Sequence, residues 1–212
     1  LDAFIAGIGQ LALSSDGAGG VAHATAMASW ELDTLIWSAG SEFRDAAISL
    51  TWADALYSAD LSLVRQRYHD MKRFHSLACF YDRTEGLVVK QQSPAPTPES
   101  WSPAGLPPGI YEELKPSVND LIDWPAQARD GFVLSNRTIV ANAHLAVATG
   151  RLAAMAEWIG FQADAAMWRN MSQTVARRIR ETMWDTRRGA FLDGQGVNHS
   201  AMLSTVLGAV SG

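Results

Sequence analysis

Apolar side chains recur every three or four residues along nearly all periodic segments of this chain, and this spacing constrains its fold more than any other feature. The spacing matches one face of an α-helix, whereas a half-buried strand alternates every second residue. It predicts helices over residues 42–57, 61–77, 138–159, 163–184 and 200–210. Strand character is confined to residues 86–90 and 190–192. Trp158, Trp168 and Trp184 are expected in the core between the helices.

Short connections between consecutive helices predict antiparallel helical hairpins. Asp60 is suited to N-cap the second predicted helix. In the 138–159 helix, Gly150 is an interruption and Gly160 is suited to the C′ position that ends it. Residues 184–194 predict a small β-hairpin around a glycine-containing turn. Helices in pairs, joined by alternating short and long connections, indicate an all-α fold of α/α type.

The composition excludes several classes of function. A chain of 212 residues, 48% hydrophobic and 18% charged, is globular with a substantial core. Its net charge of -5 and pI near 5.5 argue against a nucleic-acid partner. The single cysteine, Cys79, excludes an internal disulfide but leaves the compartment open. No apolar run is expected to reach the length of a membrane span, so no membrane partner is expected.

Seven of the eight prolines lie within residues 93–116, where proline at this density forbids helix. One interpretation is a flexible linker between domains. The other is an ordered excursion across the mouth of a helical ring, which Trp101 and Tyr111 favour. Long loops in compact domains are commonly functional when they are ordered.

Residues 120–133 combine an Asp-Trp-Pro turn and an Arg-Asp-Gly turn in one connection before a long helix. Asp123 beside Trp124 is a combination that sugar sites use, because the carboxylate accepts hydroxyl hydrogen bonds and the ring covers an apolar sugar face. The alternative is a proline-fixed turn whose Trp124 fills the helix layer beneath it. The spacing by itself favours this structural interpretation.

Several stretches occur in one order along the chain: Asp123-Trp-Pro, Arg129-Asp-Gly-Phe-Val, Asn142-Ala, residues 153–160, and residues 184–196 with His199-Ser. Together they resemble the α-L-rhamnosidases of glycoside hydrolase family 78. The resemblance is strongest from about residue 121 onward and weaker over residues 29–90. It implies an (α/α)6 toroid of six antiparallel helical hairpins. Residues 1–212 would then be a single partial domain, truncated at both ends, whose partner is the remainder of its own catalytic domain.

The resemblance implies removal of terminal α-L-rhamnose from a glycoside or polysaccharide with inversion, by one carboxyl group that protonates the leaving oxygen and a second that activates water. The family's acid lies in a motif of the form Asp-Ser-Trp-x-x-Glu. Residues 28–33 read Ala-Ser-Trp-Glu-Leu-Asp, so Asp33 stands at the position of the catalytic Glu. Ala28 replaces the first Asp of the motif, and Gly40 or Ser41 stands where a later Asp belongs. The general base would come from a later hairpin.

The resemblance also implies a set of substrate-binding residues: Trp37, Asp123, Trp124, Arg129, Asp130 and His199. We expect these side chains to lie with Asp33 at one end of the helices. The alternative for His199 is a residue at a helix start that Asn198 or Ser200 caps. No cofactor is expected. No metal site is expected either, because the spacing of His69 and His75 places them on different helix faces and excludes a two-histidine metal pair.

The departures from the acid motif leave enzyme activity uncertain. The main alternative is a catalytically inactive helical protein that binds carbohydrate or acts as a scaffold, and a third hypothesis is a helical repeat that binds protein. Sugar binding predicts a concave face lined by tryptophan and carboxylates, whereas protein binding predicts an exposed apolar one. Residues 1–212 by themselves are expected not to hydrolyse rhamnosides at a useful rate. They indicate neither the aglycone nor the cellular location.

Overall fold

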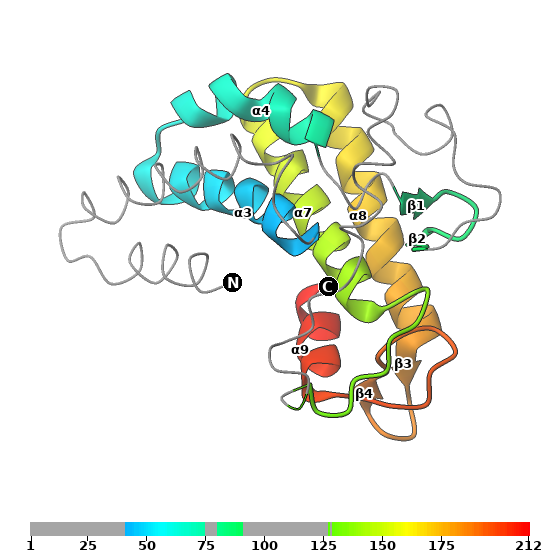
Figure 1. The fold of residues 1–212 in the computed structure, drawn as a ribbon. Helices are drawn as coiled ribbons and strands as arrows, with labels where there is room; N and C mark the ends of the chain where they lie inside the picture. Colours follow the sequence, from blue (N-terminus) through cyan, green and yellow to red (C-terminus); the bar gives the residue numbers. More distant parts are fainter. Residues whose placement is uncertain (1–40, 75–79, 91–126, 128) are drawn as a thin grey trace.

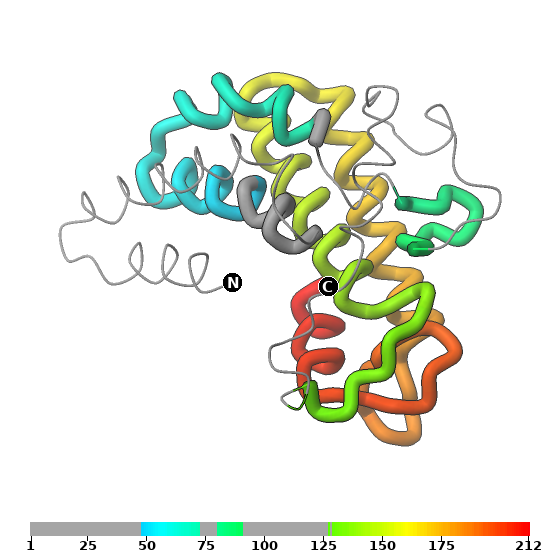
Figure 2. Tube along the Cα trace, viewed as in Figure 1, coloured from blue at the N-terminus to red at the C-terminus, as the bar shows by residue number. Residues whose placement is uncertain are grey.

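The computed structural model describes residues 41–74, 80–90, 127 and 129–212 (Figure 2). Its helices are α3 (Ser41–Ser58), α4 (Ser62–Phe74), α7 (Ile139–Trp158), α8 (Gln162–Met183) and α9 (Met202–Val210). Its strands form two antiparallel ribbons, β1 (Tyr81–Asp82) with β2 (Leu87–Val88), and β3 (Trp184–Asp185) with β4 (Ala190–Phe191). No sheet wider than two strands is present in these described ranges. The predicted all-α class is confirmed.

Helix α7 lies at the centre of the described fold and packs against α3, α8, α9 and β2 (Figure 1). Because it is buried on most sides, it is apolar all round rather than along one stripe. By length and composition alone it qualifies as a candidate membrane span, so the expectation that no apolar run reaches this length is wrong. Most of it is buried inside the structure, which is the situation of a core helix.

The ends of α7 are defined by local capping. Thr138 is its N-cap residue, in extended backbone conformation. At the other end, Gly160 has a φ of +88° and its N–H donates to Glu157 O, while Phe161 N–H donates to Ala156 O. This pair of hydrogen bonds is the Schellman arrangement, which requires a residue with positive φ. The predicted stop at Gly160 is therefore confirmed, and the chain turns directly into α8.

Gly150 does not interrupt α7, contrary to expectation, because the helix continues through it. A Cβ atom at Gly150 would lie 3.2 Å from Ser172 Oγ of α8. The Ser172 hydroxyl also donates to Ala146 O at 2.7 Å. Glycine at this position allows the two helices to approach closely, which offsets its low helix propensity.

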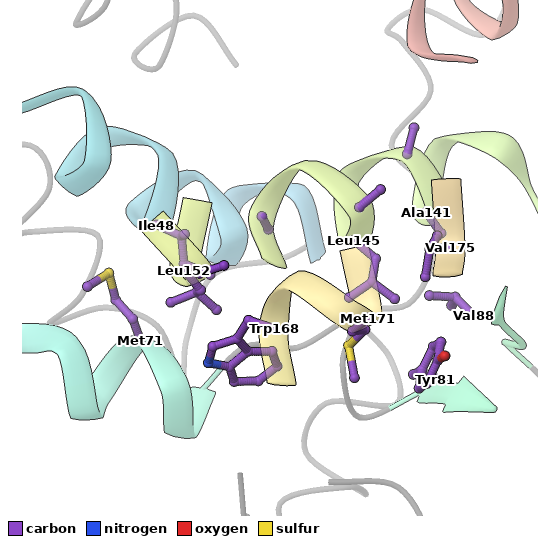
Figure 3. Packing of buried hydrophobic residues seen from close by; sticks show 14 of the residues in the cluster. Ile48, Met71, Tyr81, Val88, Ala141, Leu145, Leu152, Trp168, Met171 and Val175 are labelled. Carbon is purple, nitrogen blue, oxygen red and sulfur yellow. The ribbon is translucent and has the colours of Figure 1, made fainter. Parts of the chain in front are cut away.

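The core is continuous between α3, α4, α7, α8 and the first ribbon (Figure 3). Trp168 lies at its centre with no exposed surface, as predicted. Trp158 and Trp184 were expected there too, but they are 37% and 41% exposed. Each lies at the end of a helix, where the neighbouring helix no longer covers it. Trp184 instead packs edge-on against Phe191 across the second ribbon, with ring centroids 4.8 Å apart.

Candidate functional site

Four of the seven predicted site residues lie outside the described residues: Asp33, Trp37, Asp123 and Trp124. The structure describes the other three, Arg129, Asp130 and His199. The expectation that all seven share one end of the helices can therefore be compared with the structure only for these three.

Arg129 and Asp130 lie in a tight turn that leads towards α7. Phe132 N–H donates to Arg129 O at 2.9 Å, and the two central residues, Asp130 and Gly131, have φ values of +51° and +67°. Two positive φ values are the signature of a type I′ turn, which suits Asp followed by Gly. The Asp130 carboxylate accepts the N–H of Met202, the first residue of α9, at 2.9 Å. Asp130 thereby stabilises the N-terminus of a helix 72 residues further along the chain.

His199 lies beside this turn. A Cβ atom at Gly131 would be 3.2 Å from His199 Nε2, so the backbone of the turn runs along that edge of the imidazole. The opposite ring nitrogen, Nδ1, is 2.6 Å from Asp193 Oδ2. The His199 side chain remains 39% exposed. Asp130 and His199 are thus brought into one region, at the end of the α7–α8 hairpin that carries the second ribbon and α9.

Asp193 is the residue that organises this region, and it has no exposed surface. Its Oδ1 accepts hydrogen bonds from Ala201 N–H at 2.7 Å and from the Ser204 hydroxyl at 2.6 Å. Its Oδ2 accepts Val133 N–H at 2.8 Å and contacts His199 Nδ1. We refer to these five residues as the Asp193 cluster.

The hydrogen bonds of the Asp193 cluster determine the charge state of its carboxyl group. Burial by itself raises the pKa of Asp193. The donors at Ala201, Ser204, Val133 and His199 outweigh burial, and the pKa of Asp193 lies below its ordinary value. Asp193 is therefore a buried carboxylate at neutral pH, with every strong acceptor position occupied.

Backbone hydrogen bonds attach the Asp193 cluster to the start of α7. Ile139 N–H donates to Asp193 O, and Asp193 N–H donates to His199 O, both at 2.9 Å. Thr138 forms a bridge with Gly194, where a Cβ atom would overlap the Arg137 carbonyl. Only glycine allows this close approach of the two backbones, which places Asp193 beside the start of α7.

The alternative interpretation of His199, as a residue beside an Asn198 or Ser200 cap, is wrong. The N-cap residue of α9 is Ala201, which has no side chain able to cap. The Ser200 hydroxyl donates instead to Phe191 O at 2.6 Å. The N–H groups at the start of α9 donate to carboxylates outside the helix. Asp193 accepts Ala201 N–H, and Asp130 accepts Met202 N–H.

A second polar cluster lies at the opposite end of the α7–α8 hairpin. Asp164, in the first turn of α8, accepts the Tyr68 hydroxyl at 3.0 Å and the Lys72 ammonium at 2.9 Å. Trp168 Nε1 donates to the Tyr68 oxygen at 3.2 Å. Burial raises the pKa of Tyr68, so its hydroxyl stays protonated. These four residues, the Asp164 cluster, join α4 to α8.

Sequence reasoning identified Asp130 and His199 but missed Asp193. Asp193 was visible only as the residue before Gly194 at the end of a predicted hairpin. Its partner Val133 is 60 residues away. The arrangement can orient an imidazole and present it beside a partly exposed turn. Within the described residues, no three His, Cys, Asp or Glu side chains gather to hold a metal ion.

Comparison with known proteins identifies the family. Residues 29–211, most of the chain, match the bacterial alpha-L-rhamnosidase 6 hairpin glycosidase domain. No curated protein and no solved structure matches the chain significantly. The match agrees with the resemblance drawn from the motifs and with the helical-hairpin architecture. The chain therefore belongs to the bacterial α-L-rhamnosidase six-hairpin glycosidase domain family and is glycoside hydrolase-like.

Proposed function

We propose that this chain takes part in removing terminal α-L-rhamnose from a glycoside or polysaccharide with inversion at the anomeric carbon. The observation that carries the proposal is the family match, which spans every proposed site residue from Asp33 to His199. Inversion requires two carboxyl groups on opposite faces of the sugar. Asp33 is the proposed general acid. We place the general base in another hairpin of the six-hairpin ring, of which residues 1–212 are the proposed part.

The proposed substrate face includes Arg129, Asp130 and His199, together with Trp37, Asp123 and Trp124. A carboxylate has two oxygens, so Asp130 can hold Met202 N–H with Oδ2 and accept a sugar hydroxyl with Oδ1. The partly exposed His199 offers Nε2 in the same region. The juxtaposition of these polar groups beside one turn supports a site for a hydroxylated ligand.

A second candidate, carbohydrate binding without turnover, is favoured by the departures from the acid motif. Asp33 is one methylene shorter than Glu, and a misplacement of about 1 Å can reduce a rate about a hundredfold. Ala28 and Gly40 lack the carboxylates that the family motif has at these positions. Each general acid or base is typically worth about 10²–10⁴-fold, so one displaced group has a large effect on the rate.

An assay of the complete six-hairpin domain, which would contain residues 1–212 together with the proposed general base, separates the two candidates when it is run on an aryl α-L-rhamnoside beside calorimetric titration with L-rhamnose. Hydrolysis that disappears in Asp33→Asn supports the enzyme and the acid role of Asp33. The matched control is Asp70→Asn, which removes an exposed carboxylate on α4 that pairs with Arg67. Binding without hydrolysis supports the second candidate. Neither binding nor hydrolysis would contradict both.

A further inference from the structure

The hydrogen bonds of Asp193 determine which nitrogen of His199 carries the proton. Ala201 N–H and Val133 N–H are backbone groups that can only donate. The carboxylate accepts both, and it also accepts the Ser204 hydroxyl. Because the carboxylate has no proton to give, a 2.6 Å contact with His199 Nδ1 is attractive only if Nδ1 carries a hydrogen. In the neutral imidazole, Nε2 is then a hydrogen-bond acceptor.

The space at Nε2 is kept open by glycine. A side chain at residue 131 would begin 3.2 Å from Nε2 and 3.5 Å from Cε1 of His199. Within the described residues, no group donates a hydrogen bond to Nε2. The acceptor edge of the ring therefore lies against a turn without a side chain, in a residue that is partly exposed.

The bond between Asp193 and His199 is not needed to satisfy a buried histidine. His199 is 39% exposed, so water could take the place of a protein acceptor at its ring nitrogens. The carboxylate is already held by three donors from Val133, Ala201 and Ser204. The fourth bond fixes the tautomer and orientation of a ring that the surrounding packing leaves partly free, which is how a carboxylate prepares an imidazole in many sites.

We propose that Asp193 is a positioning residue that holds His199 as its Nδ1–H tautomer and presents Nε2, beside the Gly131 turn, as an acceptor for a hydroxyl group of a polyhydroxylated ligand. The class of ligand rests on the proposed function. The tautomer and its dependence on Asp193 do not, since they follow from the contacts within the protein.

The tautomer is tested by ¹⁵N NMR of the histidine rings in the 212-residue chain, with the His199 signal assigned by its loss in His199→Asn. We expect the neutral ring of the wild type to carry its hydrogen on Nδ1. In Asp193→Asn an amide group replaces one carboxylate oxygen, and we expect the Nε2–H tautomer to rise to a comparable or larger population. Ser204→Ala is the matched control, because it removes a donor to the same carboxylate but leaves the His199 contact.

The wild-type spectrum decides the question even if Asp193→Asn does not fold. A neutral His199 protonated on Nε2 would overturn the proposal. If Ser204→Ala changes the His199 tautomer as much as Asp193→Asn does, the tautomer depends on the packing of the whole cluster and not on the Asp193 carboxylate.

The acceptor role is tested by titration of the wild type and His199→Asn with L-rhamnose. Asparagine can still donate to Asp193 through its amide but has no atom at the Nε2 position. We expect unchanged thermal stability and roughly three- to tenfold weaker binding, the effect of one hydrogen bond. Equal affinities would contradict the acceptor role. A wild type that does not bind L-rhamnose would contradict the proposed function, while the tautomer measurement would still test the role of Asp193.

Discussion

Asp164 and Asp193 lie at opposite ends of the α7–α8 hairpin, and each is the acceptor at the centre of a polar cluster. Asp164 is held by the side chains of Tyr68 and Lys72, both on α4, and is 21% exposed. Its cluster joins two regular helices. The polar groups of the Asp164 cluster bond to one another, so the cluster holds together two helices that form independently of it.

Asp193 has no exposed surface, and two of its four partners are backbone N–H groups, one in irregular chain and one at a helix start. Backbone donors cannot change rotamer, so they restrict a carboxylate more than flexible side chains do. His199 is the one polar side chain of this cluster that is partly exposed. A rigidly held carboxylate that orients a partly exposed imidazole suits a ligand site, whereas the Asp164 cluster suits helix packing. Three experiments test this difference, in order of expected size.

Asp193→Ala is expected to have the largest effect, lowering the free energy of unfolding by roughly 3–5 kcal/mol because several buried donors lose their acceptor at once. Urea unfolding followed by circular dichroism measures it. Asp185→Ala is the control, since Asp185 accepts Arg187 and Arg188 N–H groups in the exposed turn of the second ribbon. Similar shifts of the unfolding midpoint in the two variants would show that the buried Asp193 cluster contributes no more to stability than the exposed turn does.

Tyr68→Phe tests the Asp164 cluster. The change removes the hydroxyl that donates to Asp164 and accepts from Trp168 Nε1, while Lys72 still pairs with Asp164. We expect a loss of about 2 kcal/mol in unfolding free energy, because two hydrogen bonds of ordinary strength are lost together. Tyr57→Phe, at a tyrosine that is 57% exposed, is the control in the same denaturation experiment. A loss as large as that of Asp193→Ala would remove the distinction between the two clusters.

The pH dependence is expected to be the smallest effect near neutrality. The folded pKa of Asp193 is below its unfolded value of about 3.9, so its stabilisation is complete above that value and is lost as the pH falls through the folded pKa. The wild type should therefore lose stability in acid more steeply than Asp193→Asn, which has no carboxyl group at this position. Thermal unfolding midpoints from neutral to acid pH measure this, and parallel curves would contradict it.

The helices could be predicted from sequence because their signals are local. Spacing by three and four residues and a stop at Gly160 act within a few residues, and the structure contains both. Asp60 was expected to N-cap the second helix, but it lies two residues before the first residue of α4, where its carboxylate accepts Ser62 N–H at 2.8 Å. The wrong predictions concern the packing around a helix, which depends on residues elsewhere in the chain. Gly150 allows the approach of α8 instead of breaking α7, and Trp158 lies beyond the end of the packing that would bury it.

The candidate site was predictable only in part. The Arg129-Asp-Gly turn and His199 could be selected from their residue types and from the resemblance of their motifs. That Asp130 supports α9 could not be selected, because this hydrogen bond joins residues 72 positions apart. Asp193 and His199 are only six residues apart, but Asp193 is also held by Val133, 60 positions away, and that contact is invisible in the sequence. No short pattern in the chain records such pairs. The catalytic role of Asp33 and the substrate-binding roles of the other six residues stay predictions.

By itself, the sequence determined the helical segments, the turns between them and the family, because apolar periodicity, glycine at positive φ and ordered motifs are properties of the chain read along its length. The tertiary structure alone decided which carboxylate is buried with four donors and which ring nitrogen of His199 it engages. A hydrogen bond needs its two atoms within about 3 Å and correctly aligned. For residues far apart in the chain, only the folded backbone meets that condition.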